Sequence, residues 1–401
     1  MRRIETEILV VGGGLAGLAA TAALAAEGFA TLCVDPAPVA ADEHAAGADL
    51  RSTAFLMPSV ALLERAGLWA ALEPHAAPLR LMRILEDGGP GAGIRTRAEF
   101  DAAEIGEPLF GWNLPNWLIR REMLARLSAL PGAMLRQAGF VAMVPRLRDI
   151  VVRLSDGTQV RARLVVAADG RDSAVRRALG IPAPRIGYGQ KAVVFAVSCT
   201  LPHQGVSTEI HRAGGPFTLV PLPDRDGVPH AAVVWMEDGP RAAELATMPV
   251  QAFETELNAR ACGVLGRLGL ATPRALWPII SQIAARFDGP RSLLLAEAAH
   301  VMPPIGAQGL NTSLRDVALL RDLLVEARAA GADIGAPELL ARHACRRRAE
   351  AALRIAGIDL LNRASQAGAR PLREMRRLGL EMLHRTGPLR RLAMRAGMGR
   401  G

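Results

Sequence analysis

Short apolar runs that end at glycine turns or at acids recur along this chain of 401 residues. The first run, residues 7–11, leads into a glycine turn at 12–17 and then into an Ala/Leu-rich stretch that stops around Gly28. A second run, residues 29–34, ends at Asp35. Short apolar runs are typical of buried strands, and Ala and Leu favour helix. The pattern therefore predicts strand, glycine turn, helix, strand and acid, in that order.

The turn and the acid together indicate nucleotide binding. Gly12, Gly14 and Gly17 have the spacing GxGxxG, which lets a backbone approach a pyrophosphate at the start of a helix. Asp35 follows at about the chain separation expected of the acid that binds an adenosine ribose. An acid at this position repels a 2′-phosphate, so FAD or NAD is favoured over NADP.

Two further apolar runs place acids at turns. Residues 163–168 precede Asp169 and Gly170, although a strand-to-turn Asp-Gly is common by itself and matters only beside the other motifs. Residues 292–296 precede Glu297. We therefore predict Glu297 at the carboxyl end of a strand, where α/β proteins place ligand-contacting groups.

A loop rich in proline and glycine follows Glu297. Pro303 and Pro304 stiffen this loop, and Gly306 and Gly309 remove side chains from it. The helix expected over residues 310–331 offers unpaired N–H groups and a positive dipole end, which stabilise negative charge on a bound ring or phosphate. The alternative interpretation is a rigid connection that binds nothing.

Between these motifs the sequence has a different pattern. β-prone runs at 192–199, 217–222 and 230–236 are separated by Pro, Gly and Asp, which predicts an antiparallel sheet, and residues 139–166 predict strands around a turn at 155–157. The predicted fold class is α/β, with a Rossmann-like nucleotide domain interleaved with an antiparallel β-sheet substrate domain. The predicted ranges are 1–78, 108–184 and 276–348 for the nucleotide domain, 79–107 and 185–275 for the substrate domain, and 349–401 for a C-terminal helical region.

Composition excludes several classes of protein. No apolar stretch approaches the roughly 18 uncharged residues that span a bilayer, and the first residues run directly into a strand with no room for a signal peptide, so we expect a cytoplasmic protein. The histidines lack metal-ligand spacing, and the cysteines form no CxxC pair. We predict neither a metal site nor disulfides. The cysteines are Cys33, Cys199, Cys262 and Cys345.

The net charge of +9 is concentrated in the tail, where residues 370–401 hold nine Arg against Glu374 and Glu381. The body has no basic stripe interleaved with aromatics, so nucleic-acid binding is not expected. The tail has apolar residues at helical spacing that pause at Gly387-Pro388. It either rests on an anionic membrane surface or a partner protein, or docks on the protein's own body. These apolar residues are Leu372, Met375, Leu378, Met382, Leu389 and Leu392.

Taken together, VVGGGLAG with Asp35, LVVAADGRDSAVRRALGI and AEAAHVMPPIGAQGLNTSLRDV resemble the three signature regions of the flavin-dependent aromatic hydroxylases. Within that superfamily the chain looks most like the ubiquinone-biosynthesis hydroxylase family, from residue 4 to about residue 348. The resemblance implies FAD as cofactor in the nucleotide domain and NAD(P)H as electron donor. The predicted cofactor-binding residues are Gly12, Gly14, Gly17, Asp35, Arg51, Arg121, Asp169, Glu297, Gly306, Gly309, Leu310 and Asn311.

The resemblance also implies roles. The three turn glycines would face the FAD pyrophosphate and Asp35 the adenosine ribose, while Arg51 and Arg121 match arginines near the cofactor. Asp169 belongs to a motif associated with both FAD and the pyridine nucleotide. Glu297 takes the place of the acid that holds the ribityl chain, and the backbone of Leu310 and Asn311 would meet the pyrimidine edge of the flavin.

One motif departs from the superfamily pattern, which usually has Gly-Asp where this chain has Ala296-Glu297. The acid is longer by a methylene and the residue before it is bulkier. Because the carboxylate remains, FAD binding is expected to survive, while the longer acid leaves room for a shift in the position of the cofactor.

The reaction implied by the resemblance uses oxygen. Reduced pyridine nucleotide reduces FAD, oxygen adds as a flavin hydroperoxide, and its distal OH is transferred to a phenolic ring. Pro303, Pro304 and Ile305 are predicted walls of the dry pocket that this chemistry needs. The sequence identifies no catalytic base. His300 lies close to the flavin loop, but a structural hydrogen bond is its favoured role and a catalytic one the alternative.

The family's substrate is a polyprenylated phenol of ubiquinone biosynthesis, which is too apolar to diffuse freely in water. It must be collected at the membrane or handed over by another quinone-biosynthesis protein, which gives the basic tail a purpose at the inner face of the membrane. Two alternatives stay open. One is a flavin-dependent isoprenoid reductase, and the other is a non-catalytic subunit of a quinone-biosynthesis assembly.

Overall fold

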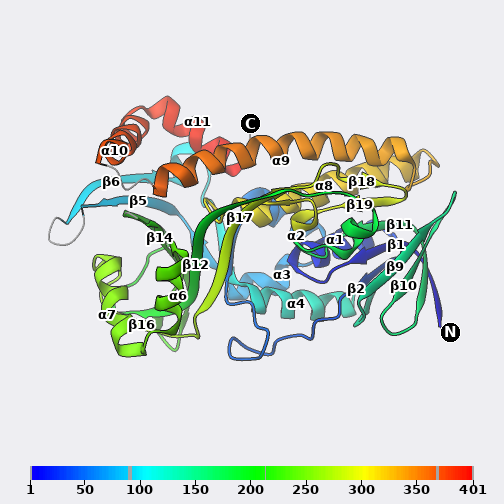
Figure 1. Ribbon diagram of the computed structural model, residues 1–401, viewed down its shortest axis with the longest axis horizontal. Coiled ribbons are helices and arrows are strands. Elements are labelled where there is room, and N and C mark those ends of the chain that lie inside the picture. Colours follow the sequence, from blue (N-terminus) through cyan, green and yellow to red (C-terminus); the bar gives the residue numbers. More distant parts are fainter. Residues whose placement is uncertain (1, 89–92, 213, 367–369, 400–401) are drawn as a thin grey trace.

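The computed structural model of the chain describes residues 2–88, 93–212, 214–366 and 370–399. The molecule is elongated (Figure 1). A sheet containing β1 (Arg3–Val11) and β2 (Thr31–Val34) lies at one end, and a sheet containing β12 (Arg185–Cys199) and β14 (Gly215–Arg225) lies at the other. The long helix α9 (Pro337–Gln366) runs over both. This arrangement brings residues from three distant parts of the sequence to the junction between the sheets.

The first sheet is largely parallel. Val11 of β1 is in register with Ala167 of β11 and with Val34 of β2, and Ala167 is in register with Leu294 of β19. The loops after these strands therefore meet at one edge of the sheet. In sheet order its strands are β18 (Asp288–Gly289), β19 (Ser292–Leu294), β11 (Gln159–Ala167), β1 (Arg3–Val11), β2 (Thr31–Val34) and β8 (Ala133–Arg136), and the predicted strands before β11 are β9 (Phe140–Pro145) and β10 (Ile150–Leu154).

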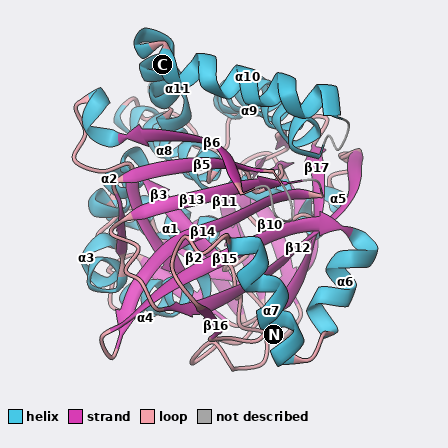
Figure 2. Ribbon diagram, turned by 90° about the vertical axis from the view of Figure 1, so that its left-hand side faces the viewer, coloured by secondary structure: helices cyan, strands magenta, loops and turns pink. Residues whose placement is uncertain are grey.

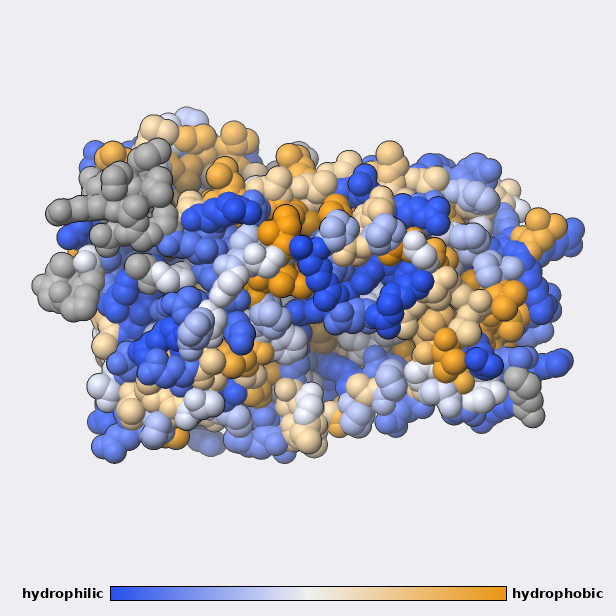
Figure 3. Space-filling view, viewed as in Figure 1, coloured by the Kyte–Doolittle hydropathy of each residue, from blue (hydrophilic) through white to orange (hydrophobic). Residues whose placement is uncertain are grey.

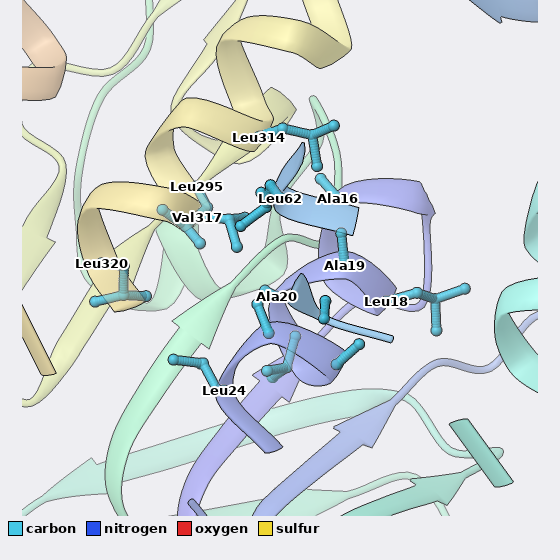
Figure 4. Packing of buried hydrophobic residues seen from close by; sticks show 14 of the residues in the cluster. Ala16, Leu18, Ala19, Ala20, Leu24, Leu62, Leu295, Leu314, Val317 and Leu320 are labelled. Carbon is cyan, nitrogen blue, oxygen red and sulfur yellow. The ribbon is translucent and has the colours of Figure 1, made fainter. Parts of the chain in front are cut away.

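Helix α1 (Leu15–Ala26) is buried on nearly all sides because it packs against this sheet and against three other helices. Figure 4 shows Ala16, Ala19 and Ala20 of α1 beside Leu314 and Val317 of α8 (Gln308–Ala329). Small alanine side chains let these elements approach closely, and alanine also favours helix. The other helices of this half are α2 (Met57–Arg65), α3 (Trp69–Leu72), α4 (Asn116–Ser128) and α5 (Ala174–Ala178).

The second sheet is antiparallel except where β13 and β5 run parallel. Figure 2 shows its strands with α10 and α11 on one side and α6 and α7 on the other. Phe195, Phe217 and Trp235 of this sheet pack with Phe253 of α7 (Val250–Ala261), and α6 (Gly239–Thr247) covers the same core. Its order is β20 (His300–Val301), β17 (Ala275–Ile283), β12 (Arg185–Cys199), β15 (Val228–Asp238), β14 (Gly215–Arg225), β13 (Val206–Arg212), β5 (Leu81–Asp87) and β6 (Ile94–Asp101), with β16 (Leu268–Leu270) beside β12.

A small third sheet connects the two halves, with strand order β3 (Ser52–Leu56), β7 (Gly111–Pro115) and β4 (Ala77–Leu79). The last three helices are α9 (Pro337–Gln366), α10 (Arg370–Arg385) and α11 (Gly387–Met398), so the predicted break at Gly387-Pro388 falls at the start of α11. Within the described ranges, none of the helices is long and apolar enough to cross a bilayer. The predicted fold class is confirmed, and the division into domain ranges remains a proposal.

Candidate active site

The glycine turn after β1 has the geometry that GxGxxG requires. Gly12 has φ +110°, and a Cβ built there would lie 2.3 Å from the carbonyl oxygen of Ala168. A Cβ on Gly17 would lie 1.9 Å from the carbonyl oxygen of Gly12. At Gly14, by contrast, a Cβ would meet nothing within 4 Å. Gly12 and Gly17 are thus required by packing of the chain itself, whereas Gly14 borders open space at the start of α1.

Asp35 closes this turn. Its two carboxylate oxygens accept hydrogen bonds from the backbone N–H groups of Gly13, at 2.5 Å, and Ala37, at 2.7 Å. Arg120 lies 3.6 Å from the carboxylate and donates to the carbonyl of Gly13 at 2.9 Å. Beside them is a cleft of about 410 Å³, lined among others by Asp35, Arg120 and Arg121. The cleft is where the adenosine end of a dinucleotide would lie.

The sequence prediction chose Arg121 of the adjacent pair and missed Arg120. Arg121 donates to the carbonyl of Ala41 at 3.1 Å and to Glu122 at 2.9 Å, at the rim of the cleft. Both arginines thus lie near the predicted nucleotide position, but only Arg120 contacts the glycine turn. The signal available in sequence was the Arg-Arg pair itself. Neighbouring residues on a helix point in different directions, and only packing decides which of them faces a ligand.

A second group of charged side chains, around Arg51 and Glu297, lies where the two sheets meet. Arg51 forms a paired hydrogen bond with Asp49, with N···O distances of 2.9 Å and 2.7 Å, and its guanidinium lies 4.0 Å from the ring centre of Trp277. Burial raises the pKa of Asp49, but hydrogen bonds from Arg51 and Asn116 outweigh it and hold that pKa below its usual value. Asp49 and Trp277 therefore hold Arg51 in place from both sides. Asp49, Asn116 and Trp277 were not predicted from the sequence.

Glu297 belongs to the same group. Its carboxylate lies 3.4 Å from Arg171 and 3.8 Å from Arg51, and its side chain is 41% exposed. It stands in the short 3-10 helix Ala296–Ala298, just after β19, close to the predicted strand end. Ala296 has φ +53°, in the left-handed region that favours glycine. This conformation explains the glycine usual in the superfamily, and an alanine here costs about 1 kcal/mol.

Helix α8 begins at Gln308, two residues before the predicted Leu310. The side chain of Asn311 is 1% exposed and accepts from the N–H of Leu56 at 2.9 Å and from Ser59 at 2.7 Å, while its amide donates to two backbone carbonyls. The polar atoms of the Asn311 side chain are thus used within the protein, so only the backbone of this turn is left for a ligand. Its contact with the flavin remains a prediction. Gly306 has φ +61°, and a Cβ on Gly309 would meet nothing within 4 Å.

Asp169 follows β11 at the same edge. Its Oδ2 accepts from the N–H of Val175 at 3.1 Å. Its Oδ1 is buried and has no hydrogen-bond partner among the described residues. A buried, unpaired carboxylate oxygen is costly, and the cost is removed by a ligand that donates to it. Together with the open space at Gly14 and the cleft at Asp35, this oxygen fits a bound dinucleotide such as FAD.

His300 is buried, with 2% of its surface exposed. Its Nε2 lies 2.7 Å from Oδ2 of Asp316, and its ring packs near Phe287 with centroids 5.9 Å apart. Because a carboxylate only accepts, the imidazole donates. This contact supports the structural role over the catalytic one.

A neighbouring histidine predicts how stability depends on pH. His343 of α9 is fully buried, and burial lowers its pKa below the ordinary 6.5. The unfolded chain takes up a proton near pH 6.5 that the folded protein resists, so the contribution of His343 to stability is complete above pH 6.5 and is lost progressively below it. We expect the melting temperature to fall between pH 7.5 and 5.5, and to fall less in His343→Gln. The exposed variant His44→Gln is the control and should follow the parent; an identical pH dependence in His343→Gln would contradict the assignment.

Comparison with known proteins agrees with this geometry. Residues 5–355 match the family described as FAD binding domain. The chain is 37% identical to ubiquinone hydroxylase UbiL of Rhodospirillum rubrum, over 98% of this chain and 89% of the relative. It is 32% identical to 3-demethoxyubiquinol 3-hydroxylase of Escherichia coli, over the full length of both. Its fold is similar to that of p-nitrophenol 4-monooxygenase PnpA of Pseudomonas putida, with a TM-score of 0.80 at 19% identity, over 100% of this chain and 99% of the other. The protein therefore belongs to the FAD-dependent aromatic hydroxylases, among the relatives of the ubiquinone-biosynthesis hydroxylases.

Proposed function

We propose that this FAD-dependent monooxygenase hydroxylates the aromatic ring of a polyprenylated phenol in ubiquinone biosynthesis, with NAD(P)H as electron donor. The observation that carries the proposal is the apolar region of the sheet next to Trp277, whose ring lies against Arg51. Ala192, Val194, Met236 and Ile279 form a buried cluster on the sheet, with Trp277 packed at its border. We expect the substrate to lie against this apolar region, which favours a hydrocarbon-bearing ring over a polar substrate.

The residues of the chain have separate tasks in this proposal. Bound FAD supplies the oxygen-activating chemistry. Gly14 and Asp35 bind the dinucleotide, Glu297 orients its ribityl chain, and the N–H groups at the start of α8 stabilise negative charge at the pyrimidine edge. The apolar cluster around Val194 excludes water from the ring that reacts. Arg51 and Arg171 hold Glu297 through the contacts described above.

The proposal is tested with purified protein loaded with FAD. A short-chain prenylphenol and NADH or NADPH are added under isotopically labelled oxygen, and the product is analysed by mass spectrometry. We expect one labelled oxygen atom in the ring, and cells that lack the gene should accumulate the phenol one hydroxyl short. Reduction of an isoprenoid double bond without oxygen uptake would indicate the reductase, and failure to retain FAD would indicate the non-catalytic subunit.

The tail supports a second proposal, that the protein touches an anionic membrane from which the substrate is collected. Leu380 and Leu383 of α10 and Met394 of α11 pack near Phe100 of β6, so the tail docks on the body. Its other face is exposed at Leu378, Met382, Leu389 and Leu392, with Arg385, Arg391 and Arg395 also exposed. Figure 3 shows apolar residues at the top of the molecule, over α9 and α11. The side chains of Leu372 and Met375 lie outside the described residues.

We expect glutamine at Leu378, Met382, Leu389 and Leu392 together to abolish sedimentation with vesicles that contain anionic lipid. Binding would be driven by burial of these apolar side chains in the surface of the lipid bilayer, and glutamine removes that driving force. Deletion of residues 370–401 should have the same effect, but it also removes the buried Met394 and Met398, so the point variant is the cleaner test. Glutamine at Val144 and Leu147, which are 60% and 89% exposed at the β9–β10 hairpin, is the control. Vesicle binding retained by the tail variant would contradict the proposal.

A further inference from the structure

A single carboxylate, that of Asp316 in α8, lies buried behind the segment that carries Glu297. Asp316 is 1% exposed. Its Oδ2 accepts from the N–H of Ala296 at 3.3 Å and from Nε2 of His300 at 2.7 Å. Its Oδ1 accepts from Nε of Arg347, a residue of α9, at 2.6 Å. One carboxylate therefore holds both ends of the short segment from residue 296 to residue 300.

The segment between these two anchors has little freedom. Ala296 is in the left-handed region, and the N–H of Ala299 donates to the carbonyl of Ala296 at 2.9 Å. The carbonyl of Ala299 in turn accepts from the N–H of Ala284 at 2.8 Å. Within this turn only Glu297 presents a charged side chain, and it is directed to Arg171 and Arg51. Displacing the anchors would move the Glu297 carboxylate directly, because no flexible backbone lies between.

The cation that faces Asp316 belongs to a ladder on α9. Arg347, Glu350 and Arg354 follow one another at helical spacing, and Glu350 also pairs with Arg315 of α8 at 3.0 Å. Arg354 donates to the side-chain oxygen of Gln308, whose amide donates to the carbonyl of Gly306 at 2.8 Å. The face of α9 that neutralises Asp316 thus also reaches the loop before α8, so both predicted cofactor loops are held by one helix.

We propose that Asp316, paired with Arg347, is the positioning residue for Glu297, and that it sets where the cofactor acid lies without touching the cofactor. The inference rests on the proposed role of Glu297 in holding FAD. A positioning role also explains why the charge of Asp316 is buried. Stability alone does not require a charge there, because a buried ion pair contributes little net stability. Its contribution is geometric, because second-shell groups of this kind orient the groups that meet the ligand.

The test is a double-mutant cycle on the affinity for FAD. Asp316→Asn keeps the shape of the side chain and removes its charge, and Glu297→Gln removes the charge it positions. Each apoprotein is titrated with FAD by flavin fluorescence. We expect each single variant to raise Kd roughly 10- to 100-fold, the cost of one charge-assisted hydrogen bond. If Asp316 acts through Glu297, the double variant will bind no more weakly than the weaker of the two single variants.

A matched control separates positioning from general loss of structure. Asp149 is another buried carboxylate with an arginine partner, Arg161 at 2.8 Å, and it lies in the β10 hairpin away from both cofactor loops. Asp149→Asn should leave the Kd for FAD within about twofold of the parent. If Asp316→Asn does not fold, His300→Leu takes its place in the cycle, since it removes one anchor and leaves the pair with Arg347.

Three results would overturn the inference. One is a double variant whose losses add, which would mean that Asp316 acts independently of Glu297. The second is an Asp316→Asn protein that binds FAD as the parent does. The third is a Glu297→Gln protein with unchanged Kd, which would remove the cofactor role of Glu297 as well. The proposed hydroxylation is judged separately, by oxygen incorporation in the parent protein, so its failure is distinguishable from failure of the cycle.

Discussion

Alanine at Gly12 or at Gly17 is expected to give a protein that is strongly destabilised and retains no FAD. The added Cβ would lie 2.3 Å from a backbone oxygen in the first case and 1.9 Å in the second. Backbone atoms cannot move aside as a flexible side chain can, and Gly12 additionally has a φ of +110°. Overpacking of this kind costs about 1–3 kcal/mol, and the unfavourable φ adds about 1–2 kcal/mol at Gly12. Urea unfolding of the apoprotein and the flavin absorbance of the purified protein measure the two effects.

Gly14→Ala separates the two requirements on this turn. Its Cβ would meet no protein atom within 4 Å, and its φ of −74° is ordinary for alanine. The apoprotein should therefore unfold at the same urea concentration as the parent, while the methyl group should weaken FAD binding where the pyrophosphate passes. An apoprotein as unstable as Gly12→Ala would contradict the geometry, and unchanged affinity for FAD would contradict the assignment of Gly14 to the cofactor.

Arg347→Met is expected to lower the free energy of unfolding by about 3–5 kcal/mol, the usual cost of removing one partner of a buried ion pair. Arg347 is 4% exposed and Asp316 1%, so the variant leaves a carboxylate in the interior without its arginine. Burial raises the pKa of Asp316, but His300 and Arg347 outweigh burial and lower that pKa to about 2. Without Arg347 the balance moves towards burial, and the deficit should shrink as pH falls and the carboxyl takes up a proton.

The matched control lies on the same helix. Arg342 pairs with Glu326 at 3.2 Å, but both side chains are more than half exposed, at 57% and 60%. Exposed pairs contribute about 0–1 kcal/mol, so Arg342→Met should unfold almost as the parent does. Equal losses in the two variants, measured by urea unfolding at pH 7.5, would show that the burial of the Asp316 pair does not matter. A loss in Arg347→Met that is independent of pH would show that the unpaired, buried carboxylate of Asp316 is not its cause.

The nucleotide half of the fold could be predicted because its demands are local. Contiguous residues define strand β1, the turn at Gly12 and the acid at Asp35. The steric need for glycine in the turn also involves residues only a few positions apart, as between Gly17 and Gly12. The helix α8 was expected from about Leu310 and begins at Gln308, a difference that reflects how weakly a helix start is specified by sequence.

The tail shows the limit of such patterns. Helical spacing and the Gly387-Pro388 pause correctly predicted two helices, α10 and α11. The same pattern did not distinguish a tail docked on the protein's own body from a tail that rests on a membrane or a partner protein. The structure places Leu383 and Met394 against the body and leaves Met382 and Leu392 exposed, so the tail has features of both. Which face docks depends on the shape of β6 beneath it, and the tail's own sequence does not contain that information.

The sequence by itself determined the family, the nucleotide fold and the predicted cofactor residues, because glycine spacing, apolar runs and terminal acids are properties of contiguous segments. Only the tertiary structure decided which charges are paired. Arg120 rather than Arg121 contacts the glycine turn, and Asp316 is neutralised from α9, 31 residues away along the chain. A charged side chain carries no local mark of its partner. Its partner is decided by which helices and strands pack together, and that is a property of the whole fold.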